Sequence, residues 1–129
     1  MTGLSRRQVV AGAAALSALG CTTVPARSET RMHGLIGKMR ATPGNRDALI
    51  AILLEATGSM PGCLSYVVAK DPADADAIWI TEVWDSAESH RASLQLPQVR
   101  SAIARGRPMI AGFDSSVETE PVGGVGLPR

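Results

Sequence analysis

The stretch Ala77-Ile-Trp-Ile-Thr-Glu-Val-Trp-Asp-Ser-Ala-Glu-Ser-His90 decides the fold, because a strand pattern passes directly into a helix start within it. Alternation places one set of side chains on one face, Ile78, Ile80, Glu82 and Trp84, and a second set on the other, Trp79, Thr81 and Val83. Both faces carry large side chains, so we expect a strand that is central in the sheet or covered by a partner.

A helix is expected immediately after this strand. Asp85 and Ser86 offer N-cap oxygens, and Glu88 follows Asp85 at capping-box spacing. His90 then falls on the first turns of the helix, just beyond the strand end. The stretch therefore delivers an acid, an indole and an imidazole to one place, which is a plausible pocket wall.

The segment before this stretch predicts two further strands and one helix. Residues 33–41 alternate as a strand, with His33, Leu35 and Met39 on one face. Apolar positions at spacings of three and four then predict an amphipathic helix over residues 45–58, with Thr42 as a cap. Residues 63–70 predict the second strand, and the polar connector 71–76 leads into the third.

The segment after His90 predicts the remaining elements. The helix from Ser86 should stop near Leu96, because Pro97 starts a second short helix. Residues 111–120 alternate as a fourth strand, with Phe113 and Val117 on one face and acidic side chains on the other. Residues 121–129 are rich in glycine and proline, and we expect an arm over a neighbour or a disordered tail.

The predicted order is β-α-β-β-α-β, the arrangement of an α+β ferredoxin-like fold with an antiparallel sheet covered by helices on one side. The other sheet face needs a cover as well. Either Tyr66 with Trp84, or Trp79 with Val67, would otherwise lie in water. We therefore expect a homodimer in which a second copy lies sheet against sheet.

The first residues have the pattern of an export signal. Ser5-Arg-Arg-Gln-Val-Val10 precedes a short apolar run, which predicts a twin-arginine signal peptide over residues 1–26 and a periplasmic or extracytoplasmic protein. The run is too short for a stable membrane span. We favour cleavage after Ala26, with lipidation at Cys21 as the alternative. One domain, residues 32–120, would follow.

The composition excludes several function classes. Loss of residues 1–26 removes Arg6 and Arg7 and changes the formal charge from +1 to −1, so no nucleic-acid surface is expected. The mature chain keeps only Cys63, which rules out an intramolecular disulfide. We find no metal cluster, nucleophilic triad or phosphate-binding glycine loop in the sequence, so hydrolase and kinase functions rank low.

Three motifs stand out: Thr81-Glu-Val-Trp-Asp-Ser86, Ser89-His-Arg-Ala-Ser-Leu94, and Pro97 with Val99. Together they resemble the antibiotic biosynthesis monooxygenase superfamily, and within it the small quinol monooxygenases. The resemblance covers about residues 32–120. It implies a dimeric α+β barrel with a pocket between sheet and helices in each protomer. It also implies oxidation of a quinol or phenol by dioxygen without flavin, haem or metal, because the substrate anion itself passes an electron to dioxygen.

This chemistry needs a base, a dry aromatic pocket and a donor to the developing oxygen anion. His90 is our candidate base, and Glu82 would orient it. Trp84 would stack on the substrate ring and offer its indole N–H. The substrate-binding candidates that complete the pocket are Tyr66, Met39, Ile80 and Phe113.

Other interpretations of these residues stay open. His90 could be a surface or capping residue, and Trp84 and Glu82 could be structural. The branch that oxidises polyketide phenols has Asn where this chain has Ile80, and the haem-degrading branch has an Asn on the first strand, where residues 33–41 contain none. The alternative function is a non-catalytic, dimeric small-ligand-binding or stress-related module of the same fold.

Overall fold

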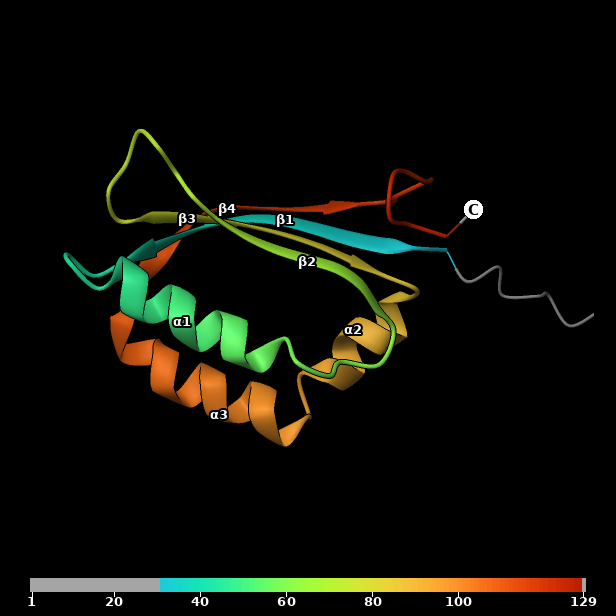
Figure 1. The fold of residues 1–129 in the computed structure, drawn as a ribbon, viewed down its shortest axis with the longest axis horizontal. Coiled ribbons are helices and arrows are strands. Elements are labelled where there is room, and N and C mark those ends of the chain that lie inside the picture. Colours follow the sequence, from blue (N-terminus) through green and yellow to red (C-terminus); the bar gives the residue numbers. More distant parts are fainter. Residues whose placement is uncertain (1–30, 129) are drawn as a thin grey trace, which may run out of the picture.

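The computed structural model describes residues 31–128, in which four strands form one sheet and the helices lie on one side of it (Figure 1). The elements in chain order are β1 (His33–Ala41), α1 (Arg46–Ala56), β2 (Cys63–Lys70), β3 (Ala77–Trp84), α2 (Ala87–Ser93), α3 (Pro97–Gly106), a 3-10 helix η1 (Arg107–Met109) and β4 (Ile110–Thr119). The sheet order is β2-β3-β1-β4, and every pairing is antiparallel. The predicted α+β ferredoxin-like fold is confirmed.

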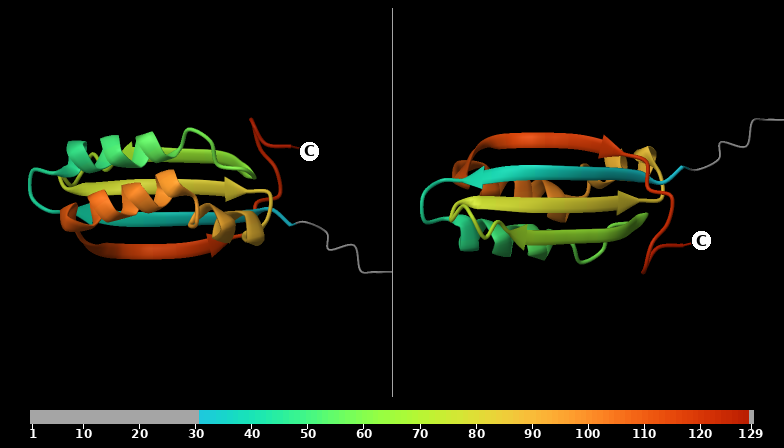
Figure 2. Two further views of the ribbon diagram at one scale, coloured as in Figure 1. Left: turned by 90° about the horizontal axis from the view of Figure 1, so that it is seen from below. Right: turned by 90° about the horizontal axis from the view of Figure 1, so that it is seen from above.

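The predicted signal segment 1–26 and Cys21 lie outside the described residues. The described part of the predicted tail, from Pro121 to Pro128, has no regular secondary structure and runs past the ends of β1 and β3 (Figure 2). Between residues 31 and 128, none of the helices combines the length and the apolar character that a membrane crossing requires.

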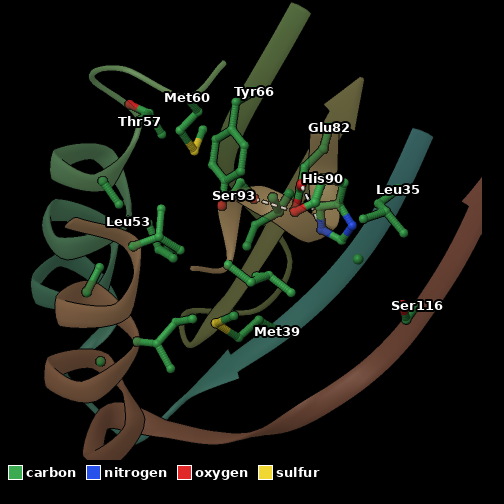
Figure 3. Close-up of a pocket in the computed structure, with 18 of the residues that line it drawn as sticks. Leu35, Met39, Leu53, Thr57, Met60, Tyr66, Glu82, His90, Ser93 and Ser116 are labelled. Carbon is green, nitrogen blue, oxygen red and sulfur yellow. Dashed lines mark hydrogen bonds and ion pairs between the residues drawn. The ribbon is translucent and has the colours of Figure 1, made fainter. Parts of the chain in front are cut away.

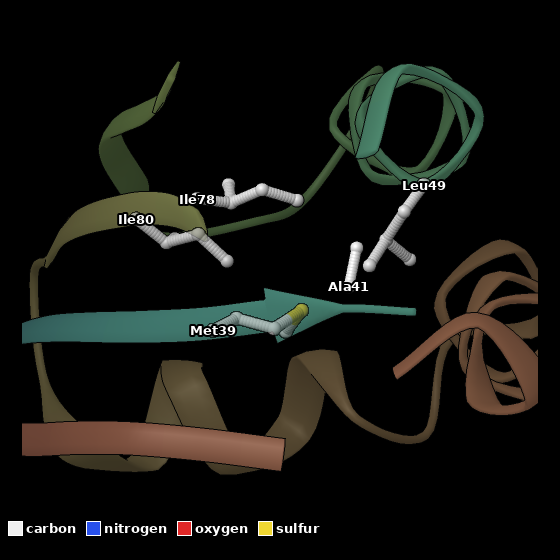
Figure 4. Packing of buried hydrophobic residues seen from close by; sticks show 5 residues of the cluster. All are labelled: Met39, Ala41, Leu49, Ile78 and Ile80. Atoms are coloured by element: carbon white, nitrogen blue, oxygen red, sulfur yellow. The ribbon is translucent and has the colours of Figure 1, made fainter. Parts of the chain in front are cut away.

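The core lies between the sheet and α1, at the end of the sheet farther from α2. Its buried residues are Met39, Ala41, Leu49, Ile78 and Ile80 (Figure 4). Leu49 is the contribution of α1, and it is 1% exposed. Full burial of a side chain of this size contributes about 1.5–3 kcal/mol, which is enough to fix the helix against the sheet.

The predicted N-caps are confirmed only in part, by Ser86 at the start of α2. Thr42 does not cap α1, because its hydroxyl oxygen accepts a hydrogen bond from Asn45 Nδ2 at 2.7 Å and the helix begins only at Arg46. At α2 the cap is Ser86, whose hydroxyl accepts from the Ser89 backbone N–H at 3.1 Å. The predicted capping-box role of Glu88 is wrong, since this carboxylate pairs with Arg91 on the helix surface instead.

The side chains of the fourth strand, β4, do not alternate regularly between the two sheet faces along its whole length. Its pairing with β1 shifts by one residue at Asp114, so that Phe113 lies opposite Met39 while Val117 lies opposite Ile36. Met39 and Ile36 point to opposite faces of β1. The prediction that Phe113 and Val117 share a face is therefore wrong, because a β-bulge reverses the sense of alternation between them.

The second sheet face is bare of helices, as the view from above shows (Figure 2). Its large apolar side chains are Ile36, Val67, Trp79 and Val117, all between 36% and 53% exposed. Tyr66 and Trp84 face the helices instead. Of the two pairs that the sequence left open, Trp79 with Val67 lies on the uncovered face.

The turn before β2 is packed directly against the start of α2. Gly62 has a φ of 84°, and its carbonyl accepts a hydrogen bond from the Asp85 backbone N–H at 2.8 Å. A Cβ atom at this position would lie 2.7 Å from Asp85 Oδ1 and would also collide with Ser89. Glycine is needed here for both its backbone conformation and its lack of a side chain.

Candidate functional site

A cavity of about 550 Å³ lies between the helix-covered sheet face and the helices (Figure 3). Strands supply one wall, and α1, α2 and α3 supply the other. The seven residues singled out in the sequence all line this cavity: Met39, Tyr66, Ile80, Glu82, Trp84, His90 and Phe113. The structure therefore brings together residues from all four strands and one helix that are up to 74 positions apart.

The polar groups gather where β3 meets α2. Glu82 and Trp84 point to the same side of β3, and the Trp84 indole N–H donates to Glu82 Oε2 at 2.8 Å. Trp84 is 1% exposed, so its side of this hydrogen bond is shielded from water. The indole N–H is thus already engaged, and the prediction that it is free to donate to a substrate oxygen is wrong.

His90 projects from α2 toward this pair. Its Nε2 lies 3.8 Å from Glu82 Oε2, and its ring centroid lies 5.3 Å from that of Trp84. The side chains of His90 and Glu82 are 23% and 17% exposed, respectively. The imidazole and the carboxylate thus lie side by side at one end of the cavity, which is an arrangement suited to proton transfer.

Tyr66 lies beside Glu82, because the two residues are partners in the β2–β3 register. Burial raises the pKa of the Tyr66 phenol far above its usual range, and the neighbouring charge of Glu82 adds to the effect. Burial likewise raises the pKa of the Cys63 thiol. Tyr66 is therefore a protonated hydroxyl group that can donate a hydrogen bond, and Cys63 is a neutral thiol.

The rest of the cavity is mainly apolar. Met39 and Ile80 are each 8% exposed and form the side of the cavity next to the core. Phe113 on the edge strand β4 is 67% exposed and lies where the cavity opens. In residues 31–128, no group of three or more metal-ligating side chains is close enough to hold an ion. The space is shaped for an aromatic or aliphatic molecule with polar groups at one end.

Sequence reasoning missed His33. Its ring centroid lies 5.6 Å from that of His90, because His33 is the register partner of Trp84 on β1. The available signal was the alternation that put His33 on the same face as Leu35 and Met39. That signal did not reveal the register between β1 and β3, on which the contact depends.

Comparison with known proteins agrees with this architecture. The family model described as antibiotic biosynthesis monooxygenase matches residues 32–105. The chain belongs to this family. Among curated proteins, none matches the chain.

Several solved structures share the antibiotic biosynthesis monooxygenase fold. One from Chloroflexus aurantiacus J-10-fl, provisionally named for this family, is 75% identical, covers 72% of this chain and 95% of its own, and has a TM-score of 0.71. Provisionally named structures from Caulobacter crescentus CB15 and Nitrosomonas europaea are 18% and 10% identical, with TM-scores of 0.64 and 0.66. They cover 74% and 72% of this chain and 93% and 92% of their own, and they show the fold alone.

Proposed function

We propose that this protein is a cofactor-independent monooxygenase that oxidises a quinol or related phenol with dioxygen. The observation that carries the proposal is the polar end of the cavity, where His90 lies beside Glu82 at the edge of a mainly apolar space. Membership of a family described as monooxygenases supports the same reaction class. A substrate hydroxyl at this end would meet the base, and its aromatic ring would fill the apolar part.

The first step is removal of the substrate's phenolic proton by a ring nitrogen of His90. Glu82 stabilises the resulting imidazolium, and the hydrogen bond from Trp84 keeps the carboxylate in place. The phenolate is far more easily oxidised than the phenol, so it passes an electron to dioxygen without help from a bound cofactor. Exclusion of water by the apolar walls strengthens the electrostatic effects of these groups.

The other candidate residues would bind the substrate and would take no part in the proton transfer. Tyr66, which keeps its own proton, can donate to an oxygen that gains negative charge. Met39 and Ile80 form an apolar surface for the ring, and Phe113 covers it at the open side. The volume of about 550 Å³ lies within the usual range for small-molecule sites.

Oxygen uptake with a panel of hydroquinones tests this function. We expect uptake well above the buffer rate for at least one compound, and a fall of about 10²- to 10⁴-fold in kcat for His90→Ala. Affinity for the substrate, measured anaerobically, should survive this change. Arg91→Ala is the matched control, because this neighbouring α2 side chain is exposed and pairs with Glu88. Uptake at the buffer rate with every compound would contradict the proposal.

The alternative is a non-catalytic module that holds a small apolar ligand, which the mainly apolar cavity also supports. Oxygen uptake by the wild-type protein separates the two functions. A binder would keep its ligand affinity in His90→Ala and would show no oxygen uptake in either form. Mass analysis of any ligand that copurifies with the protein would identify what the cavity holds.

We also propose that the protein is exported and works as a homodimer. Support for export is the twin-arginine pattern in residues 1–26, and fractionation of cells that express the full chain tests it. Appearance of the protein only in the cytoplasmic fraction would contradict export. Support for the dimer is the uncovered apolar face of the sheet.

A further inference from the structure

His33 lies against the imidazole of His90 without itself lining the cavity. The two ring centroids are 5.6 Å apart and the ring planes are inclined by 32°, so the rings make a tilted contact. The β1–β3 register fixes this position, because it places His33 opposite Trp84. His90 thus contacts the cavity, the indole and a second imidazole.

The charged and titratable groups around the two imidazoles come from several elements. On β3, Glu82 lies within 4 Å of His90, and its side chain is partly buried. On β2, Cys63 and Tyr66 hold their protons. On α2, Glu88 and Arg91 are exposed and pair with each other. The other charged groups are Glu118 on β4, opposite Leu35, and the exposed pair of Arg31 with Glu120.

Two imidazolium ions at this separation repel each other, and the single carboxylate of Glu82 stabilises one positive charge better than two. We propose that His33 and His90 form a coupled pair, in which a proton on either ring disfavours a proton on the other. His33 is then a positioning residue that sets the pH range in which His90 can accept the substrate's proton. This role for the pair rests on the proposed function, whereas the coupling itself does not.

The coupling has a direct consequence for the base. His90 must begin each cycle without a proton, and a proton on His33 favours that state of its neighbour. When the substrate hydroxyl gives its proton to His90, the Glu82 carboxylate offsets the new charge. Replacement of His33 by a side chain that cannot take up a proton would let His90 take a proton from solvent at higher pH and would leave less unprotonated His90 available as a base.

Histidine-selective NMR can measure the coupling, because His33 and His90 are the only two histidines of the chain. Both signals of the wild-type protein should titrate over a broadened pH range. In His33→Phe, which keeps an aromatic ring in this contact, the His90 signal should titrate in a single step and at a higher pH than in the wild-type protein. Glu82→Gln should move the His90 signal in the opposite direction, and Arg91→Gln should leave it in place.

A His90 titration that is unchanged in His33→Phe would overturn the proposal, whether or not the protein consumes oxygen. His33→Gln gives the same test with a polar side chain if the phenylalanine variant does not fold. Where turnover is measurable, the acid limb of the kcat/KM profile should move to higher pH in His33→Phe while the plateau is kept. A lower plateau with an unmoved acid limb would show that His33 only packs, and would also overturn the proposal. Failure to find any oxidised substrate would remove the function and leave the titration result standing.

Discussion

At the scale of single residues, Tyr66 makes the protein sensitive to alkaline pH. Burial, and then the charge of Glu82, raise the pKa of its phenol in the folded state, whereas an unfolded tyrosine titrates near pH 10. Above about pH 10 the unfolded chain therefore gives up a proton that the folded chain keeps. The free energy of unfolding should be unaffected by this group below that pH and should fall as the pH rises above it.

The chain contains a single tyrosine, so the ultraviolet absorbance of tyrosinate reports on Tyr66 alone. We expect no tyrosinate signal from the folded protein at about pH 10, and its appearance only at higher pH or together with unfolding. Tyr66→Phe should flatten the alkaline loss of stability. A normal tyrosinate titration in folded protein would show that the phenol is open to water.

At the scale of elements, Arg46 fixes the connection between β2 and β3. Its Nη1 donates to the backbone carbonyls of Asp71, Asp74 and Ala77 at 3.2, 2.8 and 3.5 Å. The first residue of α1 thus holds the connector that aligns the central strand β3. We expect Arg46→Met, which keeps the apolar stem, to lower the free energy of unfolding by about 1–3 kcal/mol in urea titrations.

Arg105→Met is the matched control for this prediction. Arg105 pairs with Glu55 at 2.9 Å, but both side chains are about half exposed, so its loss should change the stability by less than about 1 kcal/mol. Equal effects of the two substitutions would mean that the contacts of Arg46 with the connector contribute nothing beyond an ordinary surface pair.

The elements also show what the sequence could and could not predict. Residues 77–90 were predictable because alternation, capping oxygens and the helix start are local signals. Phe113 lines the cavity, yet the bulge at Asp114 was not predicted, since it appears only when β4 is paired with β1. The engaged indole of Trp84 and the contact of His33 were missed for the same reason: both depend on distances between side chains that no local pattern contains.

At the scale of the whole molecule, the bare sheet face combines exposed apolar side chains with charges that are already paired. Lys38 lies 3.2 Å from Asp71, and Arg40 lies 2.7 Å from both Asp74 and Asp114. A second copy could therefore cover this face without leaving these charges unpaired, which removes a main cost of burying them. The same argument supports the proposed dimer.

We expect Val67→Glu and Val117→Glu to convert the dimer into a folded monomer. Both valines are about half exposed in the single chain, so a charge there should cost the monomer little and should be strongly unfavourable inside an interface. Sedimentation velocity gives the mass, and circular dichroism verifies the fold. Leu54→Glu, on the surface of α1, is the control that should remain dimeric. A wild-type chain that sediments as a monomer would contradict the proposal.

Gly62 has a consequence that extends to the imidazole of His90. Because no side chain fits between this turn and α2, the helix that carries the proposed base is positioned by a residue more than twenty positions earlier in the chain. Gly62→Ala would push α2 outward and separate His90 from Glu82 with the whole acid–base set still present. This protein would therefore lose the proposed activity through a substitution outside the cavity, with every proposed reactive side chain still present.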